Sequence, residues 1–491
     1  MTSLFKNASW GGLSAAARLA FGVGNIFLAI KLAGSVAYGY LALISSVTVF
    51  YVALIGSVHT VAVTHAAHYR QRAGQEKNIE SLFSLVWLVT CCSALILVLL
   101  AAWFGNSFVH AFVYWGGDAE VESQLSSLLI LVVMMALSQL FSAGNVAVIE
   151  SLGRFDRAAQ AQMMGPFVVF ICLMLLFLLG EEQWSVLDVG KAMIVGGITD
   201  VILTSAARTK MGYLSAFKPS LQAIGLFGAL FKGGVALQGA RLINIFFDPL
   251  NKYLLNYFVG AESVSVYDFA IKIIFGIQGL FGGAFRSFLQ MVGGLGGDSG
   301  QNYLKALSYG LVPAVVIHGV ISIAFFSFFC LLGDAFSSLP YFFVLLIPGS
   351  LGVIVVAPLY SALIGAKDFG FVFKAHLILS VLNGVISVLF IPVIGLYGAG
   401  IGFLIATVYN VFSGIRRYQK VVGQIAGVAT VVEELLPKLF ITVSSLFILL
   451  ASELFINSDI LLWVVRGGLL LLFSGVLVFE PMTRRVFRLF L

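Results

Sequence analysis

Residues 231–288 read FKGGVALQGARLINIFFDPLNKYLLNYFVGAESVSVYDFAIKIIFGIQGLFGGAFRSF, which predicts two membrane-spanning helices with ionisable side chains inside them. The polar residues of the first helix share about a third of its surface and are Gln238, Arg241, Asn244 and Asp248. Those of the second helix are Asp268, Lys272 and Arg286. At about 100° per residue, Lys272 and Arg286 share one narrow face with three glycines: Gly276, Gly279 and Gly283.

These charged residues indicate a polar cavity within the membrane. A cation at the centre of a bilayer costs about 2.5–3.5 kcal/mol on insertion scales, so it normally faces water or a partner. The glycines beside Lys272 leave room for a bulky group to approach the helix backbone. The stretch therefore predicts a cationic cavity for an anionic, lipid-linked substrate.

The whole chain has the composition of a polytopic α-helical membrane protein. Its 491 residues are 60% hydrophobic and 10% charged, with a mean hydropathy of +1.04, whereas globular proteins are about a quarter charged. Continuous apolar runs of about twenty residues favour membrane helices over the shorter alternating segments of a membrane barrel. The net charge of +6 comes from basic residues in short loops, which indicates membrane orientation rather than nucleic-acid binding.

The sequence contains no motif for catalysis or for a bound cofactor. It has no phosphate-binding loop, zinc motif or nucleophile elbow, so neither ATP-driven transport nor enzymatic catalysis is indicated. His65 and His68 lie three residues apart, but no further metal ligands are patterned nearby. We therefore expect a protein that is not an enzyme and has no metal site.

Hydropathy predicts about fourteen spans. In chain order they cover residues 10–30, 39–64, 82–104, 124–149, 162–180, 190–206, 225–247, 261–289, 306–331, 341–364, 374–393, 396–414, 437–456 and 460–480. With the N-terminus inside, about nineteen Lys and Arg residues fall in cytoplasmic segments and about three in outer loops, Lys252 among the latter. Because cytoplasmic loops collect basic residues, both termini are expected in the cytoplasm.

Two pairs of short motifs, each six spans apart, indicate an internal repeat. Residues 152–156 (LGRFD) parallel residues 364–368 (IGAKD), and residues 37–39 (AYG) parallel residues 266–268 (VYD). We therefore expect two pseudo-symmetric six-helix lobes with the site between them, followed by two more helices. The predicted parts are lobes at 1–206 and 225–414, cytoplasmic linkers at 207–224 and 415–436, and a final helix pair with a basic tail at 437–491.

The first span adds a further buried cation to the predicted site. Arg18 lies about eight residues into this span, roughly 12 Å from its cytoplasmic end, and Asn25 lies on the same small and polar face. In a two-fold arrangement, Arg18, Arg241 and Lys272 are expected to converge on a diphosphate. The candidate substrate-binding residues are Arg18, Asn25, Gln238, Arg241, Lys272 and Arg286.

Three acidic residues are candidate coupling residues or charge partners. Asp268 lies one turn before Lys272 and can pair with it, and Asp248 can pair with Arg241 near the outer end. Asp200, in the sixth span, either couples transport to a proton or cation or packs against Thr204. In the paired alternatives the charges have a structural role and bind no substrate.

The chain resembles the Wzx-type polysaccharide flippases of the multidrug/oligosaccharidyl-lipid/polysaccharide (MOP) superfamily. The resemblance covers nearly the whole length and includes the two Gly-containing motifs and Tyr267-Asp268. It implies a two-lobed, alternating-access transporter in the bacterial cytoplasmic membrane that moves an undecaprenyl-diphosphate-linked oligosaccharide, such as an O-antigen unit, to the outer leaflet. It also implies coupling to H⁺ or Na⁺, and association with membrane lipids, a polysaccharide polymerase and a chain-length regulator.

Three alternatives stay open at this point. A lipid II flippase has a cavity of the same charge sign, whereas a drug or cation antiporter of the same superfamily needs acidic residues at mid-depth. A non-transporting membrane subunit of a polysaccharide-export complex would hold its buried charges in internal ion pairs.

Overall fold

A computed structural model describes residues 2–46, 66, 76–114, 119–180, 185–211, 243, 247–292, 314–327, 329–365, 368–421, 465–466 and 468. These residues form α-helices and two short 3-10 helices, and no strand occurs among them. Within the part of the chain that the structure describes, eight helical segments are long and apolar enough to cross a membrane. The prediction of an all-α polytopic membrane protein is therefore confirmed, and the total of fourteen spans stays a prediction.

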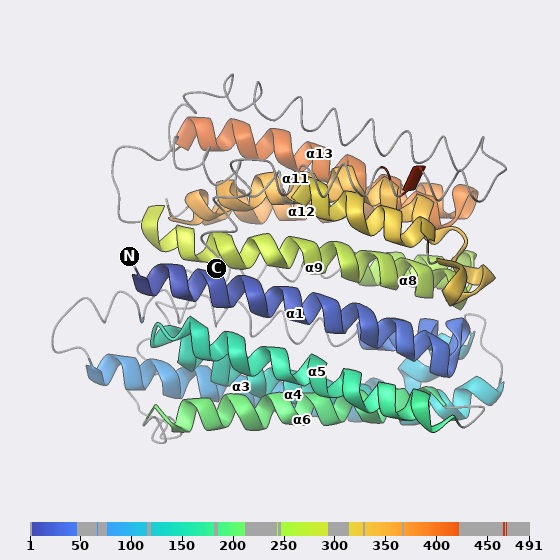
Figure 1. Cartoon of the computed structure of the whole chain (residues 1–491), viewed down its shortest axis with the longest axis horizontal. Coiled ribbons are helices and arrows are strands. Elements are labelled where there is room, and N and C mark those ends of the chain that lie inside the picture. The colour runs from blue at the N-terminus through green and yellow to red at the C-terminus, as the bar shows by residue number, and fades with distance from the viewer. Residues whose placement is uncertain are drawn as a thin grey trace. The chain divides into compact units, whose positions relative to one another are not determined.

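Apart from α8, the labelled helices follow the predicted spans closely (Figure 1). They are α1 (Thr2–Ala33), α3 (Glu76–Tyr114), α4 (Ala119–Ser151), α5 (Phe155–Leu179), α6 (Val186–Thr209), α8 (Asp248–Phe258), α9 (Ala261–Val292), α11 (Leu339–Gly365), α12 (Phe369–Ile394) and α13 (Leu396–Val421). Shorter elements are the helices Ser35–Ser46 and Ala314–Ser327 and the 3-10 turns η2 (Phe329–Leu332) and η3 (Asp334–Phe336). The predicted spans at 225–247, 437–456 and 460–480 fall almost entirely outside the described residues.

The chain divides into two compact units. One holds the described residues of Ala17–Asp268 and Val372–Ser380, and the other those of Met1–Ala16, Phe269–Phe371 and Val381–Leu491. Both α1 and α9 contribute residues to each unit. The predicted lobe and linker boundaries stay predictions.

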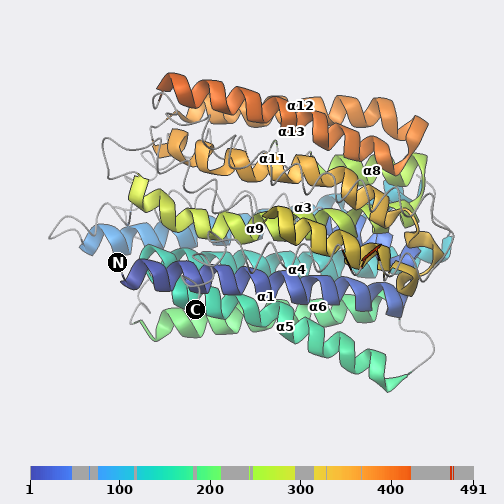
Figure 2. The same ribbon diagram turned by 45° about the horizontal axis from the view of Figure 1, so that its top comes forward.

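Small residues let the helices of the Ala17–Asp268 unit approach closely. In this unit α3, α4, α5 and α6 lie side by side (Figures 1 and 2). A Cβ added at Gly196 of α6 would come within 2.2 Å of Val169, and one at Gly197 within 2.2 Å of the Ser138 hydroxyl. Gly165 of α5 is similarly confined, 2.4 Å from Asp200. These contacts hold α6 against both α4 and α5, and Gly144 of α4 packs at 3.0 Å against Thr90 of α3.

The second unit uses the same kind of packing between α11 and α13. A Cβ at Gly349 would lie 2.4 Å from the ring of Phe403, and one at Gly352 would lie 2.8 Å from Thr407. At the end of α13, Arg417 Nε lies 2.6 Å from Asp368 Oδ2, so the aspartate of the second predicted motif forms an ion pair. Asp156 of the first motif also forms one, with Arg154 at 3.0 Å.

Candidate functional site

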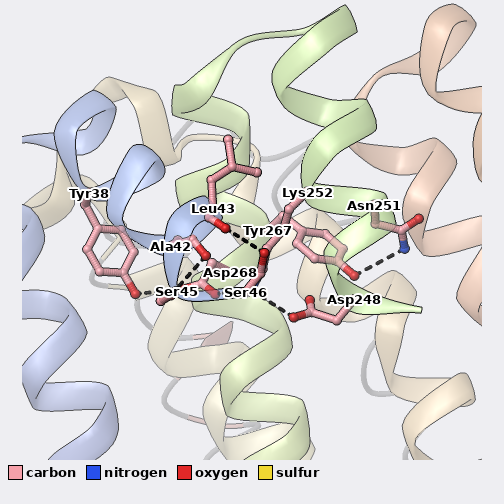
Figure 3. A network of polar contacts seen from close by, with 10 residues as sticks. All are labelled: Tyr38, Ala42, Leu43, Ser45, Ser46, Asp248, Asn251, Lys252, Tyr267 and Asp268. Carbon is pink, nitrogen blue, oxygen red and sulfur yellow. Dashed lines mark hydrogen bonds and ion pairs between the residues drawn. The ribbon is translucent and has the colours of Figure 1, made fainter. Parts of the chain in front are cut away.

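Among the described residues of the Ala17–Asp268 unit, two groups of polar contacts include candidate site residues. We call the first the Lys252 cluster: Tyr38, Asp248, Asn251, Lys252, Tyr267 and Asp268 (Figure 3). The second, the Asp200 group, consists of Asn25, Gly165, Pro166 and Asp200.

The Lys252 cluster begins with the first turn of α8. Asp248 is the first residue of this helix and Pro249 the second. Proline suits the first turn because the N–H that it lacks would have no acceptor within the helix. Lys252 lies one turn later, where its Nζ is 2.9 Å from Asp248 Oδ2 and 2.7 Å from Asp268 Oδ1 of α9. A single ammonium group therefore connects two carboxylates on two helices.

Two tyrosines complete the Lys252 cluster. The Tyr38 hydroxyl donates to Asp268 Oδ2 at 2.6 Å, and the Asn251 amide donates to the Tyr267 hydroxyl at 3.2 Å. Asp268, Asn251 and Lys252 are at most 3% exposed. The cluster contains two carboxylates and one ammonium group. The hydrogen bond from the Tyr38 hydroxyl helps to stabilise the additional negative charge.

The Lys252 cluster lies where the helix Ser35–Ser46 meets the start of α9. A Cβ at Gly39 would lie 2.0 Å from the carbonyl oxygen of Ala261, so this approach requires glycine. The Ser265 hydroxyl donates to the Ser35 carbonyl oxygen, and the Ser35 hydroxyl donates to Glu262 at 3.2 Å. The two tyrosine motifs matched in the sequence are therefore in contact with each other.

Lys252, predicted to lie in an outer loop, is part of a helix instead. It lies on α8 and is buried because Asp248 and Asp268 both bind it. Asp268, which the spacing offered as a partner for Lys272, is fully buried against Lys252 and Tyr38. Both acids act as charge partners in this structure.

The Asp200 group joins residues of α1, α5 and α6. The backbone N–H of Gly165 donates to Asp200 Oδ1 at 3.0 Å, and a Cβ at Gly165 would lie 2.4 Å from the carboxyl carbon of Asp200. Arg18, seven residues before Asn25 on α1, is exposed. The second sequence alternative, a contact with Thr204, also occurs, but through the Asp200 backbone oxygen at 2.6 Å.

Asn25 lies two turns beyond Arg18 on α1. Its amide nitrogen donates to the Pro166 carbonyl oxygen at 3.0 Å, next to the residue that donates to Asp200. Its amide oxygen is buried without a hydrogen-bond donor among the described atoms. Asn25 therefore ties α1 to the same turn of α5 that holds Asp200.

Lys272 lies on the exposed side of α9. Lys272, Phe275 and Gly279 are exposed, whereas Ile273, Ile274 and Ile277 are at most 1% exposed. Nothing lies within 4 Å of a Cβ placed at Gly279. The predicted face of cations and glycines is thus open along this part of α9.

The remaining predicted site residues cannot be placed as side chains. Arg286 belongs to the α9 helix, but its side chain lies outside the description, as do Gln238, Arg241 and Asn244 altogether. Arg18 belongs to one compact unit and Lys272 to the other, so their convergence stays a prediction. Among the residues that the structure describes, no group of three or more His, Cys, Asp or Glu side chains could hold a metal ion.

The chain is similar to solved structures of known transporters, and this similarity identifies its fold. No protein-family model and no curated protein sequence matches the chain. The solved structure of the lipid II flippase MurJ, in its inward closed conformation, aligns with a TM-score of 0.69 at 14% identity over 94% of this chain and 96% of the flippase. An inward-facing multidrug resistance MATE family transporter of the MOP superfamily aligns with a TM-score of 0.63 at 14% identity, over 83% of this chain and 98% of that one.

A third similar structure concerns pocket charge. It is a MOP superfamily transporter from Pyrococcus furiosus, whose reversed binding-pocket polarity is said to suggest a different function; its TM-score is 0.52 at 13% identity, over 86% of this chain and 96% of that one. This chain has the fold of these MOP superfamily transporters.

Within this MOP fold, sequence reasoning missed Lys252 and Gly165 as site residues. The Asp248–Lys252 spacing of one helical turn was a usable signal, but α8 has only 11 residues and long hydropathy windows do not resolve so short a helix. Gly165 precedes a proline inside an apolar run and looks like a packing residue. Its contact with Asp200 joins residues 35 positions apart, which no local pattern reveals.

Proposed function

We propose that this protein is a transporter that moves an anionic, lipid-linked oligosaccharide across the bacterial cytoplasmic membrane by alternating access. The substrate class is an undecaprenyl-diphosphate-linked glycan, an O-antigen or related unit, carried from the inner to the outer leaflet. Both termini are on the cytoplasmic side in this proposal. H⁺ or Na⁺ provides coupling, and a polysaccharide polymerase and chain-length regulator use the product.

The observation that carries this proposal is the exposure of Arg18 and Lys272 deep within apolar helices. Arg18 lies eight residues into the segment Trp10–Ala33, about 12 Å along it, and Lys272 lies eleven residues into Ala261–Phe281, about 16 Å along it. Both side chains are exposed. Because a cation facing lipid at that depth is costly, the exposure of each one supports wet surroundings or an anionic ligand beside it.

The MOP fold supports two substrates of this chemistry. Its likeness to the lipid II flippase over 94% of the chain favours lipid II as a second candidate, since lipid II is also a polyprenyl-diphosphate-linked sugar. A drug or cation antiporter is less well supported, because the exposed mid-helix charges at Arg18 and Lys272 are positive. A non-transporting subunit fits the Lys252 cluster, whose charges are internally paired, but gives no role to the exposed face of α9.

The substrate can be identified in a host from which the gene has been deleted. We expect lipid-linked oligosaccharide to accumulate on the cytoplasmic face and surface glycan to disappear, and mass spectrometry of extracted lipids identifies the glycan. Accumulation of lipid II instead would select the second candidate. Unchanged surface glycan together with unchanged lipid II levels would contradict both.

Complementation of this deletion tests the cations. Arg18→Ala and Lys272→Ala should each fail to restore surface glycan although the proteins reach the membrane in normal amounts. Lys191→Ala is the matched control, because Lys191 is exposed and pairs with Asp188 in the first turn of α6. Full restoration by both cavity variants would remove the main support for an anionic substrate.

A further inference from the structure

Three hydrogen bonds join the two predicted lobes where the helix that begins at Ser35 meets the start of α9. The Ser35 hydroxyl donates to Glu262 Oε1 at 3.2 Å, and the Ser265 hydroxyl donates to the Ser35 carbonyl oxygen. The Tyr38 hydroxyl donates to Asp268 Oδ2 at 2.6 Å (Figure 3). These pairs are 227–230 positions apart in the chain, so the first predicted lobe is tied directly to the second at this point.

The contact runs from an exposed edge to a buried centre. Glu262, at the edge, is exposed, whereas Tyr38 and Asp268 are at most 1% exposed. Beside Tyr38, a Cβ at Gly39 would lie 2.0 Å from the Ala261 carbonyl oxygen, so no side chain fits between the two helices there. Water is therefore excluded from the hydrogen bond between Tyr38 and Asp268 while the two helices are in contact.

Hydrogen-bonded contacts of this kind can open into water at little cost. When the two helices separate, each donor and acceptor exchanges its protein partner for water, so the net stabilisation that is lost is small. An apolar contact has no such exchange and loses the whole free energy of its burial. A movable contact between two lobes is therefore better made of hydrogen bonds than of apolar side chains.

Lys252 keeps the Asp268 carboxylate paired when the Tyr38 hydroxyl leaves it. The Lys252 Nζ lies 2.7 Å from Asp268 Oδ1 and 2.9 Å from Asp248 Oδ2, and all three of these residues belong to the second predicted lobe. A buried charge that loses its partner is strongly destabilising. Because the ion pairs lie within one lobe, separation of the lobes breaks the hydrogen bond from Tyr38 and leaves the carboxylate with its cation.

The proposed orientation puts this contact at the outer face of the membrane. The membrane-spanning part of α1 is Trp10–Ala33, and Ser35 follows its last residue by two positions. A cytoplasmic N-terminus therefore places Ser35 and the contact beside it on the opposite side.

We propose that the hydrogen bond from Tyr38 to Asp268 is a lock that closes the outer end of the transport path and opens once in each transport cycle. The inference rests on the proposed function, because alternating access requires a contact of this kind between the lobes to open. The lock opens when the start of α9 moves away from the helix Ser35–Ser46 and water enters between them.

The first test measures opening of the lock without any substrate. Ser265 is fully buried beside Ser35, so a cysteine in its place reacts with a charged, membrane-impermeant thiol reagent only when the contact opens. The purified protein carries Ser265→Cys, with its four native cysteines replaced by serine. Adding Tyr38→Phe keeps the ring but removes the donor to Asp268. Labelling at position 265 should become about tenfold faster, since a hydrogen bond to a charged group is lost.

Tyr360→Phe is the matched control for Tyr38→Phe. The Tyr360 hydroxyl donates to Asn410 within the other compact unit, and Tyr360 is also buried. This variant therefore loses a buried tyrosine hydrogen bond that joins α11 to α13 and does not join the lobes. Labelling at position 265 should keep the rate of the parent protein in Tyr360→Phe. Equal labelling rates in Tyr38→Phe and Tyr360→Phe would overturn the lock.

The second test holds the lock closed. A short, reducible bifunctional thiol reagent should link Ser35→Cys to Glu262→Cys, because the native side chains are 3.2 Å apart. In proteoliposomes, the cross-linked protein should flip a fluorescent undecaprenyl-diphosphate sugar no faster than protein-free vesicles do, and dithiothreitol should restore flipping. Asp188→Cys with Lys191→Cys is the matched control pair, since these side chains are 2.7 Å apart within α6. Linking them should leave the rate unchanged.

The results separate this inference from the proposed function. Cross-linked protein that flips the lipid as fast as the reduced protein would overturn the lock and leave the proposed function intact. Faster labelling in Tyr38→Phe, in a protein that flips no polyprenyl-diphosphate lipid, would overturn the substrate assignment and leave the lock intact. The cross-linked protein retains both Tyr38 and Asp268, so the second test decides the outcome even where Tyr38→Phe does not fold.

Discussion

At the residue scale, Lys252 shows how a charge is accommodated inside an apolar bundle. An ammonium group at 3% exposure is stable only when its hydrogen bonds and charge are compensated. Asp248 provides a partner from the same helix and Asp268 from another. The arrangement fixes α8 to α9 at one point, because the ion pairs require a specific geometry.

We expect Lys252→Met to destabilise the protein by about 3–5 kcal/mol, because it leaves two carboxylates buried without their cation. Thermal unfolding in detergent measures this. Lys191→Met should cost about 0–1 kcal/mol, since the Lys191 side chain is 66% exposed and its pair with Asp188 lies at the surface. Equal unfolding temperatures for the two variants would contradict the structural role of the Lys252 cluster.

The pair Asp368–Arg417 should give the protein a pH-dependent stability. The hydrogen bond from Arg417 lowers the pKa of Asp368 below its usual value, which is about 3.9 in unfolded chains. Its stabilisation is therefore present above that pH and is lost as the pH falls through the lower folded-state pKa. Asp368→Asn should be less stable than wild type at pH 7, and the difference should shrink below about pH 4.

Denaturation as a function of pH, with Arg417→Gln as the companion variant, checks this prediction. Arg417→Gln should remove the same pH-dependent part of the folding stability. The double variant should be no less stable than either single variant. A stability difference that persists undiminished at the lowest pH would show that the pair does not titrate as described.

At the element scale, Gly39 sets the distance between the helix Ser35–Ser46 and α9. There is no room for a side chain at this position, because a Cβ would lie 2.0 Å from the Ala261 oxygen. By contrast, a Cβ at Gly22 of α1 has nothing within 4 Å. The two glycines therefore have different physical roles although both lie in apolar helices.

Gly39→Ala should destabilise the protein by about 1–3 kcal/mol, because it forces the two helices apart. Gly22→Ala should not, and the general preference of helices for alanine over glycine gives it up to about 1 kcal/mol of added stability. Unfolding temperatures of the two purified variants test the contrast. If Gly39→Ala were as stable as wild type, the close approach at Ala261 would be wrong.

The sequence predicted the long helices well because their apolar runs leave few alternatives. The predicted span 82–104 matches Ile79–Trp103, and 374–393 matches Gly370–Ile394. The 11-residue helix α8 was missed, because three of its five buried residues are polar and the burial of Lys252 depends on Asp268, sixteen residues further along the chain. Such cross-helix pairing has no local signature.

At the scale of the whole molecule, charge placement distinguishes the proposed substrate better than the fold does. The fold is shared with a lipid II flippase and with a multidrug transporter at the same 14% identity. Sequence reasoning could find Arg18 and Lys272 because cations are rare in apolar runs. It could not find that the Gly165 N–H donates to Asp200, since that contact joins α5 to α6.

The most direct measurement of the central claim is flipping of a fluorescent undecaprenyl-diphosphate sugar by purified protein in proteoliposomes. We predict that the wild type moves this lipid at least tenfold faster than protein-free vesicles do, and faster than it moves a cationic lipid of equal chain length. Arg18→Gln combined with Lys272→Gln should reduce the rate to that of empty vesicles. A double variant that flips the diphosphate lipid at the wild-type rate would contradict the claim that Arg18 and Lys272 bind the substrate during transport.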